Sequence, residues 1–188
     1  MSSPAAARGE AVRRRLLAAA LELVPERGWP AVSTRVLAER AGVTPSVVHY
    51  HFASVQALLV EAVLEAMRGV VGEFEPMLER ARTPEEAVDA MTGSVEQYTG
   101  ADPMSLLFIE AYLAATRDEA LRRGIAEILD GLRTRLAGWF RDHGVPDADA
   151  TAAVLAATVD GLLLHRALSP APATSAAVLR RLVRGVAG

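Results

Sequence analysis

The chain of 188 residues contains no cysteine, no lysine and no asparagine. The absence of cysteine excludes disulfide scaffolds, thiolate zinc sites and cysteine nucleophiles. The longest run without Asp, Glu, Arg or His covers residues 167–179 and includes two prolines. It falls short of the roughly 20 apolar residues that a membrane-spanning helix needs. We therefore expect a cytoplasmic protein with no membrane partner.

The charges that are present are unevenly distributed. All 20 basic residues are arginine, and the formal net charge is −3. Residues 1–52 hold seven arginines and four acidic residues, whereas the rest of the chain has an acidic excess. A basic N-terminal part is compatible with contact to nucleic acid. The arginine-only, alanine-rich composition also suggests a GC-rich bacterial genome, and alanine favours helix.

Apolar residues recur at spacings of three and four along the chain, and no segment keeps the alternation of a strand. We therefore predict an all-α fold of about nine helices, with residues 1–8 frayed. Pro25 should kink the first helix or end it early, and Gly28 follows as a stop signal. The predicted helices cover residues 9–27, 34–41, 45–52, a long segment from Ser54 toward Phe74, 84–99, 104–116, 118–143, 147–168 and 175–186.

Two short helices near the N-terminus are separated by a glycine turn. Ser33 can cap the first and Thr44 the second, and Pro45 stands at the favoured first helical position. Gly42 begins the turn between them. This order predicts a helix-turn-helix, with one domain over residues 1–53 and a second helical domain over residues 54–188.

The segment STRVLAERAGVT (33–44), followed by PSVVHYHF (45–52) and Leu58-Leu59, resembles the DNA-binding domain of the TetR family of bacterial transcriptional regulators. The segments FIEAY (108–112) and DGLL (160–163) resemble the ligand-binding and dimerisation half of that family. The chain departs from the family pattern at Val55, where a lysine usually contacts a phosphate. The absence of that phosphate contact would lower the affinity and its salt dependence. His49 and His51 also flank Tyr50 where the family often has tyrosines.

The resemblance implies that the second short helix enters the major groove of double-stranded DNA. Its buried side should carry Val48 and Phe52, packed with Leu37 and Val43. His49 and His51 lie on different sides of the helix, so we expect no metal site. The Arg13-Arg14-Arg15 run fits either a phosphate backbone or a solvated helix face. The predicted DNA-binding residues are Thr34, Arg35, Thr44, Pro45, Ser46, Val47, His49, Tyr50 and His51, although several of them would be ordinary surface side chains in another context.

The C-terminal part carries stripes of methionine and aromatic residues that fit either a helical core or an apolar effector cavity with a few orienting polar groups. Glu110 and Asp160 are carboxylates among apolar neighbours, so each needs a partner. Arg117, Arg166 or a bound cation are the candidates. The predicted ligand-binding residues are Met91, Tyr98, Met104, Phe108, Tyr112, Trp139, Asp160 and His165.

Small residues at a spacing of four on the eighth predicted helix would let another helix approach closely. The resemblance implies that this helix and the last one form a four-helix bundle with a second copy of the chain. The alternative is that both stripes belong to the intramolecular core. The predicted interface residues are Ala153, Ala157, Gly161, Leu164, Leu179, Leu182, Val183 and Val186.

These observations favour a ligand-responsive homodimeric regulator, a repressor that binds a palindromic operator and is released by a small molecule. We expect no catalytic residues and no cofactor, because the sequence has no phosphate-binding glycine loop, no H-E-x-x-H and no G-x-S-x-G. The alternatives are a small enzyme or a helical interaction module that binds no DNA. Neither alternative accounts for the helix-turn-helix pattern.

Overall fold

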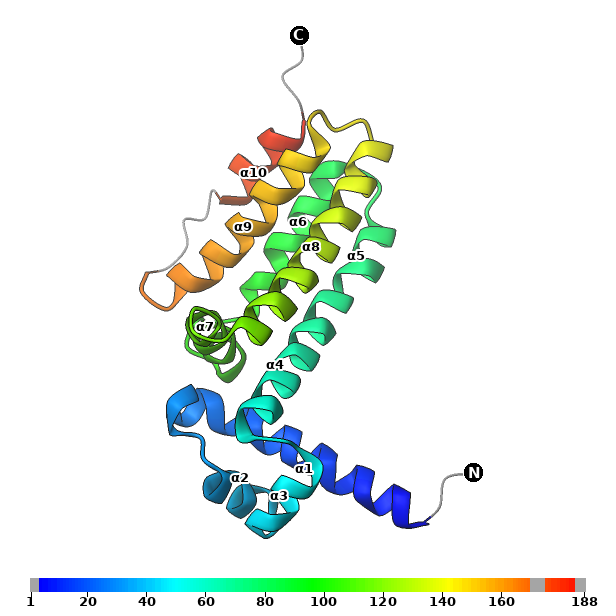
Figure 1. Cartoon of the computed structure of the whole chain (residues 1–188). Coiled ribbons are helices and arrows are strands. Elements are labelled where there is room, and N and C mark those ends of the chain that lie inside the picture. Colours follow the sequence, from blue (N-terminus) through cyan, green and yellow to red (C-terminus); the bar gives the residue numbers. More distant parts are fainter. Residues whose placement is uncertain (1–3, 170–174, 185–188) are drawn as a thin grey trace. The chain divides into compact units, whose positions relative to one another are not determined.

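The computed structural model describes residues 4–169 and 175–184. Over those residues the chain forms ten α-helices and one short 3-10 turn, and it has no strand (Figure 1). The all-α prediction is confirmed. The elements are α1 (Pro4–Arg27), η1 (Trp29–Ala31), α2 (Thr34–Ala41), α3 (Pro45–His51), α4 (Val55–Gly72), α5 (Phe74–Arg80), α6 (Pro84–Glu96), α7 (Pro103–Ala115), α8 (Glu119–Asp142), α9 (Ala148–Arg166) and α10 (Ser175–Val183).

The helices pack into two compact units that are not consecutive in sequence. The first unit takes the chain up to Met67 together with Leu106–Gly124, and the second takes Arg68–Ser105 together with the chain from Ile125 onward. Most of α7 and the beginning of α8 therefore belong to the same unit as the N-terminal helices, and this stretch, Leu106–Gly124, is called the α7–α8 segment below. The predicted boundary between residues 53 and 54 separates a DNA-binding part from a second helical domain, and this functional division stays a prediction.

The helix-turn-helix in the first unit is set by local signals. The Ser33 hydroxyl accepts a hydrogen bond from the backbone N–H of Val36 at 3.4 Å, as expected of a cap. Gly42 adopts a left-handed conformation with φ 65° and ends α2. The Ser54 hydroxyl likewise accepts from the backbone N–H of Ala57 at 3.0 Å at the start of α4. These caps account for the observed helix boundaries.

Two local predictions are wrong, those of a frayed N-terminus and of a cap at Thr44. Residues 4–8 are helical. The first helix also does not stop early, because α1 continues through Pro25 to Arg27, whereas a kink at Pro25 stays a prediction. A proline removes one backbone donor but leaves the following N–H groups free to bond, and that of Gly28 reaches the carbonyl of Val24 at 2.9 Å. Thr44 makes no side-chain bond to the backbone of α3, because its hydroxyl pairs with that of Ser46 at 2.9 Å.

The predicted fourth helix, from Ser54 toward Phe74, is present as α4, which ends at Gly72, whereas α5 from Phe74 to Arg80 was not predicted. A turn at Glu73 separates the two helices. Pro76 explains the break: it has no N–H to donate to the carbonyl of Gly72, and its ring would clash with that carbonyl in a continuous helix. The remaining predicted helices are present with ends no more than three residues from the predicted ones, and α2 matches at both ends.

The core of the second unit is built mainly by α6, α8, α9 and α10. Phe140 and Met91 are its largest fully buried side chains, and they are 0% and 2% exposed. Leu155 from α9 and Leu179 from α10 belong to the same cluster. α10 contacts both α6 and α9.

One helix of the second unit, α9, is long and apolar enough by length and composition to cross a membrane. That is weak evidence for a membrane span, since core helices of soluble proteins meet the same criterion. The side of α9 with Ala152, Leu155 and Ala156 is buried in the protein core.

Asp102 caps α7 and is suited to a test of helix capping. Its carboxylate accepts from the Ser105 backbone N–H at 3.0 Å, the Ser105 hydroxyl at 2.7 Å and the Thr99 backbone N–H at 2.7 Å. Burial works to raise the pKa of Asp102, but these hydrogen bonds outweigh it and lower the pKa to about 2.

We predict that Asp102→Ala lowers the free energy of unfolding by about 1 kcal/mol at neutral pH. A carboxyl whose pKa is depressed by folding stabilises the protein above its unfolded pKa, and this stabilisation is lost as the pH falls toward 2. The difference from the wild type should therefore shrink in acid. Urea titrations at several pH values measure it, with the exposed Asp142→Ala as the control. A difference that stays constant down to pH 2 would contradict this role of Asp102.

Candidate nucleic-acid interface

The α3 helix presents a polar and aromatic face to solvent and an apolar face to the interior. Tyr50 is 84% exposed, and Val48 is completely buried. Phe52 and Leu37 are buried with Val48, as predicted, whereas Val43 is only half-buried. The exposed side therefore keeps its residues free for an external partner, while the opposite side holds α3 on the rest of the N-terminal helices; α1, η1, α2 and α3 are called the head below.

The predicted DNA-binding residues differ in their exposure. Arg35, Thr44, Pro45, Ser46, His49 and Tyr50 are exposed, whereas Thr34, Val47 and His51 are half-buried. The ring of His51 meets the ring of Tyr50 edge-on, with centroids 5.0 Å apart. The Thr44–Ser46 hydroxyl pair fixes two side chains at the start of α3. The arrangement offers hydrogen-bonding groups and one aromatic ring to a groove.

The arginines of the N-terminal helices divide into two groups. Arg40 on α2 is held by two carboxylates of α1, Glu22 at 2.9 Å and Glu26 at 2.6 Å. The pKa of Arg40 is raised, first by its hydrogen bond to Glu26 and then by that to Glu22. This contact joins α1 to α2, and it pairs the Arg40 guanidinium with carboxylates of its own chain.

Arg13 is occupied in the same way. It pairs with Glu61 of α4, and its guanidinium lies 4.9 Å from the centre of the Phe52 ring. Among the described residues, neither Arg14, Arg15 nor Arg35 forms an ion pair, and all three are exposed. The Arg13-Arg14-Arg15 run is therefore split, and only its second and third members remain available for phosphates.

The predicted effector residues fall in both units. Phe108 and Tyr112 lie on α7 in the first unit, whereas the other six belong to the second. Met91 is a buried core residue there, and Trp139 stacks on His143 with ring centroids 3.7 Å apart. Tyr98 and Met104 are half-buried, and Asp160 and His165 are exposed. A cavity common to these residues stays a prediction.

The expected partner of Glu110 is wrong. The carboxylate of Glu110 accepts a hydrogen bond from the backbone N–H of Trp29 at 2.8 Å, rather than pairing with Arg117 or Arg166. Arg166 instead donates to the backbone carbonyls of Val95 and Tyr98, at 2.8 and 2.9 Å. Pairing between residues 81 positions apart leaves no local signal in the sequence, so periodicity could not have shown it.

The predicted dimer residues divide between the interior and the surface. Leu179 and Val183 are 5% and 2% exposed and belong to the core of their own chain, so their assignment to an interface is wrong. The prediction placed Leu179, Leu182 and Val183 on one stripe, but Leu182 is exposed while the other two are buried, so α10 has apolar residues on two sides. Ala153 and Gly161 are half-buried, Ala157, Leu164 and Leu182 are exposed, and Val186 lies outside the described residues.

The sequence of this chain matches two family models of known proteins. Residues 16–62 match the family model of bacterial regulatory proteins of the tetR family, and residues 82–188 match the model of the tetracyclin repressor-like C-terminal domain. The chain belongs to the TetR family. It is therefore a DNA-binding transcriptional regulator of the helix-turn-helix type. The match to the C-terminal domain model is consistent with a ligand-responsive regulator.

Individual TetR relatives agree with this assignment. The chain is 31% identical to the HTH-type transcriptional regulator BetI of Rhizobium meliloti over 87% of this chain and 82% of that protein. It is 32% identical to a solved transcriptional regulator of Streptomyces coelicolor, with a TM-score of 0.78 and coverage of 92% and 98%. A transcriptional regulator of Saccharomonospora viridis solved in complex with choline shares the fold at 23% identity, with a TM-score of 0.70 and coverage of 93% and 94%.

The division of the arginines gives a testable difference between Arg35 and Arg40. We expect Arg35→Ala to weaken binding to any DNA sequence and to reduce the slope of log affinity against log salt by about 0.9 for each phosphate that is no longer bound. Its unfolding transition should stay unchanged. Arg40→Ala should instead lower the stability of the head, because it breaks the contact between α1 and α2.

Salt titrations of DNA binding and thermal unfolding of both variants measure this difference. Each variant serves as the matched control for the other. A loss of stability in Arg35→Ala with no change in salt slope would contradict the division.

Proposed function

We propose that the chain is a homodimeric, cytoplasmic repressor that binds a palindromic operator through α3 and leaves it when a small molecule binds. The observation that carries the DNA-binding part is the face of α3, where Tyr50 stands almost fully exposed over a completely buried Val48. A single exposed aromatic residue is common on protein surfaces. The support therefore comes from the position of Tyr50 on the helix that follows the glycine turn, where its ring and hydroxyl can reach a DNA groove.

The dimer is supported by a stripe of residues along α9 and the turn that follows it. Val154, Leu164 and Leu168 are large apolar side chains in solvent, at 52%, 48% and 85% exposure. Val154, Ala157, the half-buried Gly161 and Leu164 follow one another at spacings of three, four and three residues, which places them along one face of α9. Leu168 lies in the turn two residues after the end of α9. The buried residues of α9 lie at other positions, so this stripe is left for a partner.

The neighbouring helix α10 adds to the same argument. Val178 and Leu182 are 45% and 48% exposed and lie one turn apart, while Leu179 and Val183 fill the core. Since α9 and α10 contact each other, two copies of the pair could form a four-helix bundle. Small residues at Ala157 and Gly161 would allow close approach of the helices.

A dimer with two-fold symmetry constrains the operator. Two identical heads related by such an axis read an inverted repeat, and groove faces on one side of DNA recur about every 34 to 36 Å. An effector that changes the relation between the heads would weaken binding to the whole palindrome more than to a half-site. By linkage, operator DNA would then weaken effector binding by the same factor.

The operator and the role of α3 are tested by selection from a random-sequence DNA library. The wild type should enrich an inverted repeat, and Tyr50→Ala should enrich none while unfolding at the wild-type temperature. A repeat selection with candidate small molecules tests release, and choline, which the Saccharomonospora viridis protein holds, is the first compound to include. Operator affinity unimpaired in Tyr50→Ala would contradict the assignment of α3.

The dimer is tested by Gly161→Arg. A Cβ atom added at Gly161 meets nothing within 4 Å in its own chain, so the protomer should fold normally. We expect the long charged side chain to separate the two copies and to abolish operator binding with the dimer, since joined heads bind with a high effective concentration.

Sedimentation and gel shift measure both effects. Gly138→Arg on α8 is the matched control, because a Cβ at Gly138 also meets nothing within 4 Å, and it should leave the dimer intact. A Gly161→Arg protein that stays dimeric would place the interface elsewhere.

A further inference from the structure

A chain of hydrogen bonds inside the first unit joins the N-terminal helices to α7 and α8. The carboxylate of Glu110 on α7 accepts from the backbone N–H of Trp29 at 2.8 Å. The same carboxylate lies beside Gly28, whose φ of 79° ends α1. The first N–H of a helical turn has no partner within the turn, so Glu110 satisfies a group that the η1 turn itself cannot.

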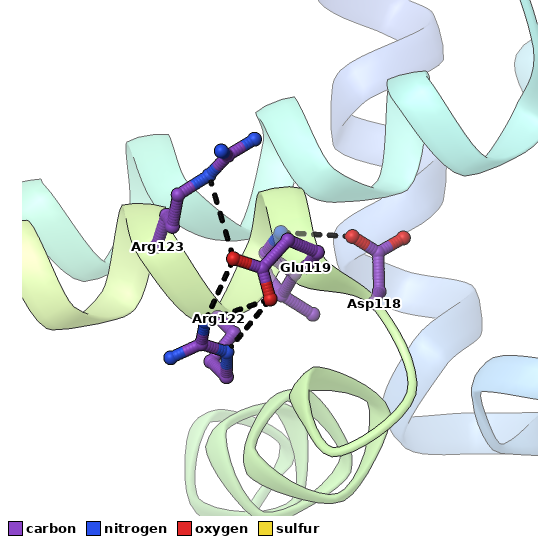
Figure 2. A network of polar contacts seen from close by, with 5 residues as sticks. Asp118, Glu119, Arg122 and Arg123 are labelled. Atoms are coloured by element: carbon purple, nitrogen blue, oxygen red, sulfur yellow. Dashed lines mark hydrogen bonds and ion pairs between the residues drawn. The ribbon is translucent and has the colours of Figure 1, made fainter.

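The side chain of Trp29 extends this series of hydrogen bonds. Its indole N–H donates to Oε1 of Gln56 at 3.1 Å, and Nε2 of Gln56 donates to Oδ2 of Asp118 at 2.8 Å. The other oxygen of Asp118 accepts from the backbone N–H of Leu121 at 2.9 Å. Figure 2 shows Asp118 at the start of α8, beside the Glu119–Arg122 ion pair. Hydrogen bonds from Leu121 and then Gln56 lower the pKa of Asp118.

The chemistry of these groups allows Gln56 one orientation. An indole N–H only donates and an ionised carboxylate only accepts. Gln56 must therefore offer its oxygen to Trp29 and its nitrogen to Asp118. A side chain that bridges them must carry both an acceptor and a donor, and Gln56 presents one of each at the two observed distances.

Close packing reinforces the connection within the same unit. A Cβ added at Gly124 on α8 would fall 2.3 Å from Cδ1 of Leu64 on α4. The two helices thus pack closely at this point, and a side chain at position 124 would require the Leu64 side chain to move. Gln56 at the start of α4 and Leu64 further along it contact the α7–α8 segment at two separate points.

We propose that Gln56 is a positioning residue that couples the α7–α8 segment to the DNA-reading helices through Trp29. The η1 turn connects α1 to α2, and Ser33, the cap of α2, follows it within two residues. An anchored Trp29 fixes where α2 begins and so orients α3, which packs on α2. A rearrangement of α7 or α8 must carry the head with it or break these bonds.

This coupling gives an effector a route to the head. Phe108 and Tyr112, two of the predicted effector residues, lie on α7 on either side of Glu110. A small molecule that shifts α7 acts directly on the acceptor of the Trp29 N–H. The inference rests on the proposed function, because its consequence is a change in operator affinity.

An exchange of the donor and the acceptor between positions 56 and 118 tests this coupling. Gln56→Glu keeps the acceptor for Trp29 but sets a second carboxylate against Asp118. Asp118→Asn keeps the acceptor for Leu121 but sets one amide N–H₂ group against another. The double variant Gln56→Glu/Asp118→Asn restores a donor and an acceptor at the contact with its direction reversed. Gln97→Glu at the exposed end of α6 is the control for the added charge.

We expect each single variant to lose about tenfold in affinity for the selected operator, the size expected for a broken charged hydrogen bond. The double variant should recover wild-type affinity, as a coupled pair does. The indole N–H resonance of Trp29, assigned with a Trp29→Phe sample, should shift in the single variants and return in the double variant. If a single variant fails to fold, the double variant must still fold and bind as the wild type does.

Two results would overturn the inference. One is single variants that bind the operator as tightly as the wild type. The other is a double variant no better than the worse single one. If the wild type selects no DNA sequence at all, the proposed function itself fails, and the regulatory role of Gln56 fails with it; the Trp29 resonance would still report whether the hydrogen-bond chain exists.

Discussion

The hydrogen bond from the Trp29 backbone N–H to Glu110 is the constraint on which the N-terminal unit depends. Gly28 turns the chain out of α1 with a positive φ, and the next N–H is left without a partner in its own turn. Trp29 is 8% exposed, and an unsatisfied donor at such a position costs about 1 to 3 kcal/mol. Its acceptor comes from 81 residues further along the chain, so the head is complete only when α7 is in place.

Because of this constraint, the compact units of the regulator do not coincide with its predicted DNA-binding and ligand-binding parts. Reading and sensing occupy different segments of a TetR protein, yet the compact units here do not separate at the end of α3. α4, α7 and α8 each contribute residues to both units. Any signal from the second unit therefore reaches the head along helices that are continuous in the chain. Regulation of DNA binding then becomes a matter of how α7 and α8 hold Trp29 and Gln56.

The recognition surface depends mainly on local features, and this is why the sequence could predict it. Ser33, Gly42 and Ser54 act over three or four residues, and each does in the structure what its type and position indicate. The burial of Val48 and Phe52 follows from their spacing of four. Thr44 was the exception, because a neighbouring hydroxyl competed for its side chain.

Features that depend on distant residues could not be predicted in the same way. The helical period shows which residues share a face, but it does not say whether that face meets its own chain or another. On α10, Leu179 and Val183 point into the core, whereas Leu182 remains exposed. The partner of Glu110 was equally hidden, since an unpaired backbone donor at residue 29 has no signature in residue type. The short helix α5 was missed, although Pro76 signals a break after the fourth helix.

Native-state hydrogen exchange tests the central claim, that the head and the α7–α8 segment form one unit. Peptides covering residues 28–33 and 106–117 should open with the same free energy, because loss of either side of the Glu110–Trp29 bond exposes both. Glu110→Gln, which weakens the acceptor, should lower protection in both peptides together. If residues 28–33 keep their protection while 106–117 lose theirs, the head is independent of α7 and the account is wrong.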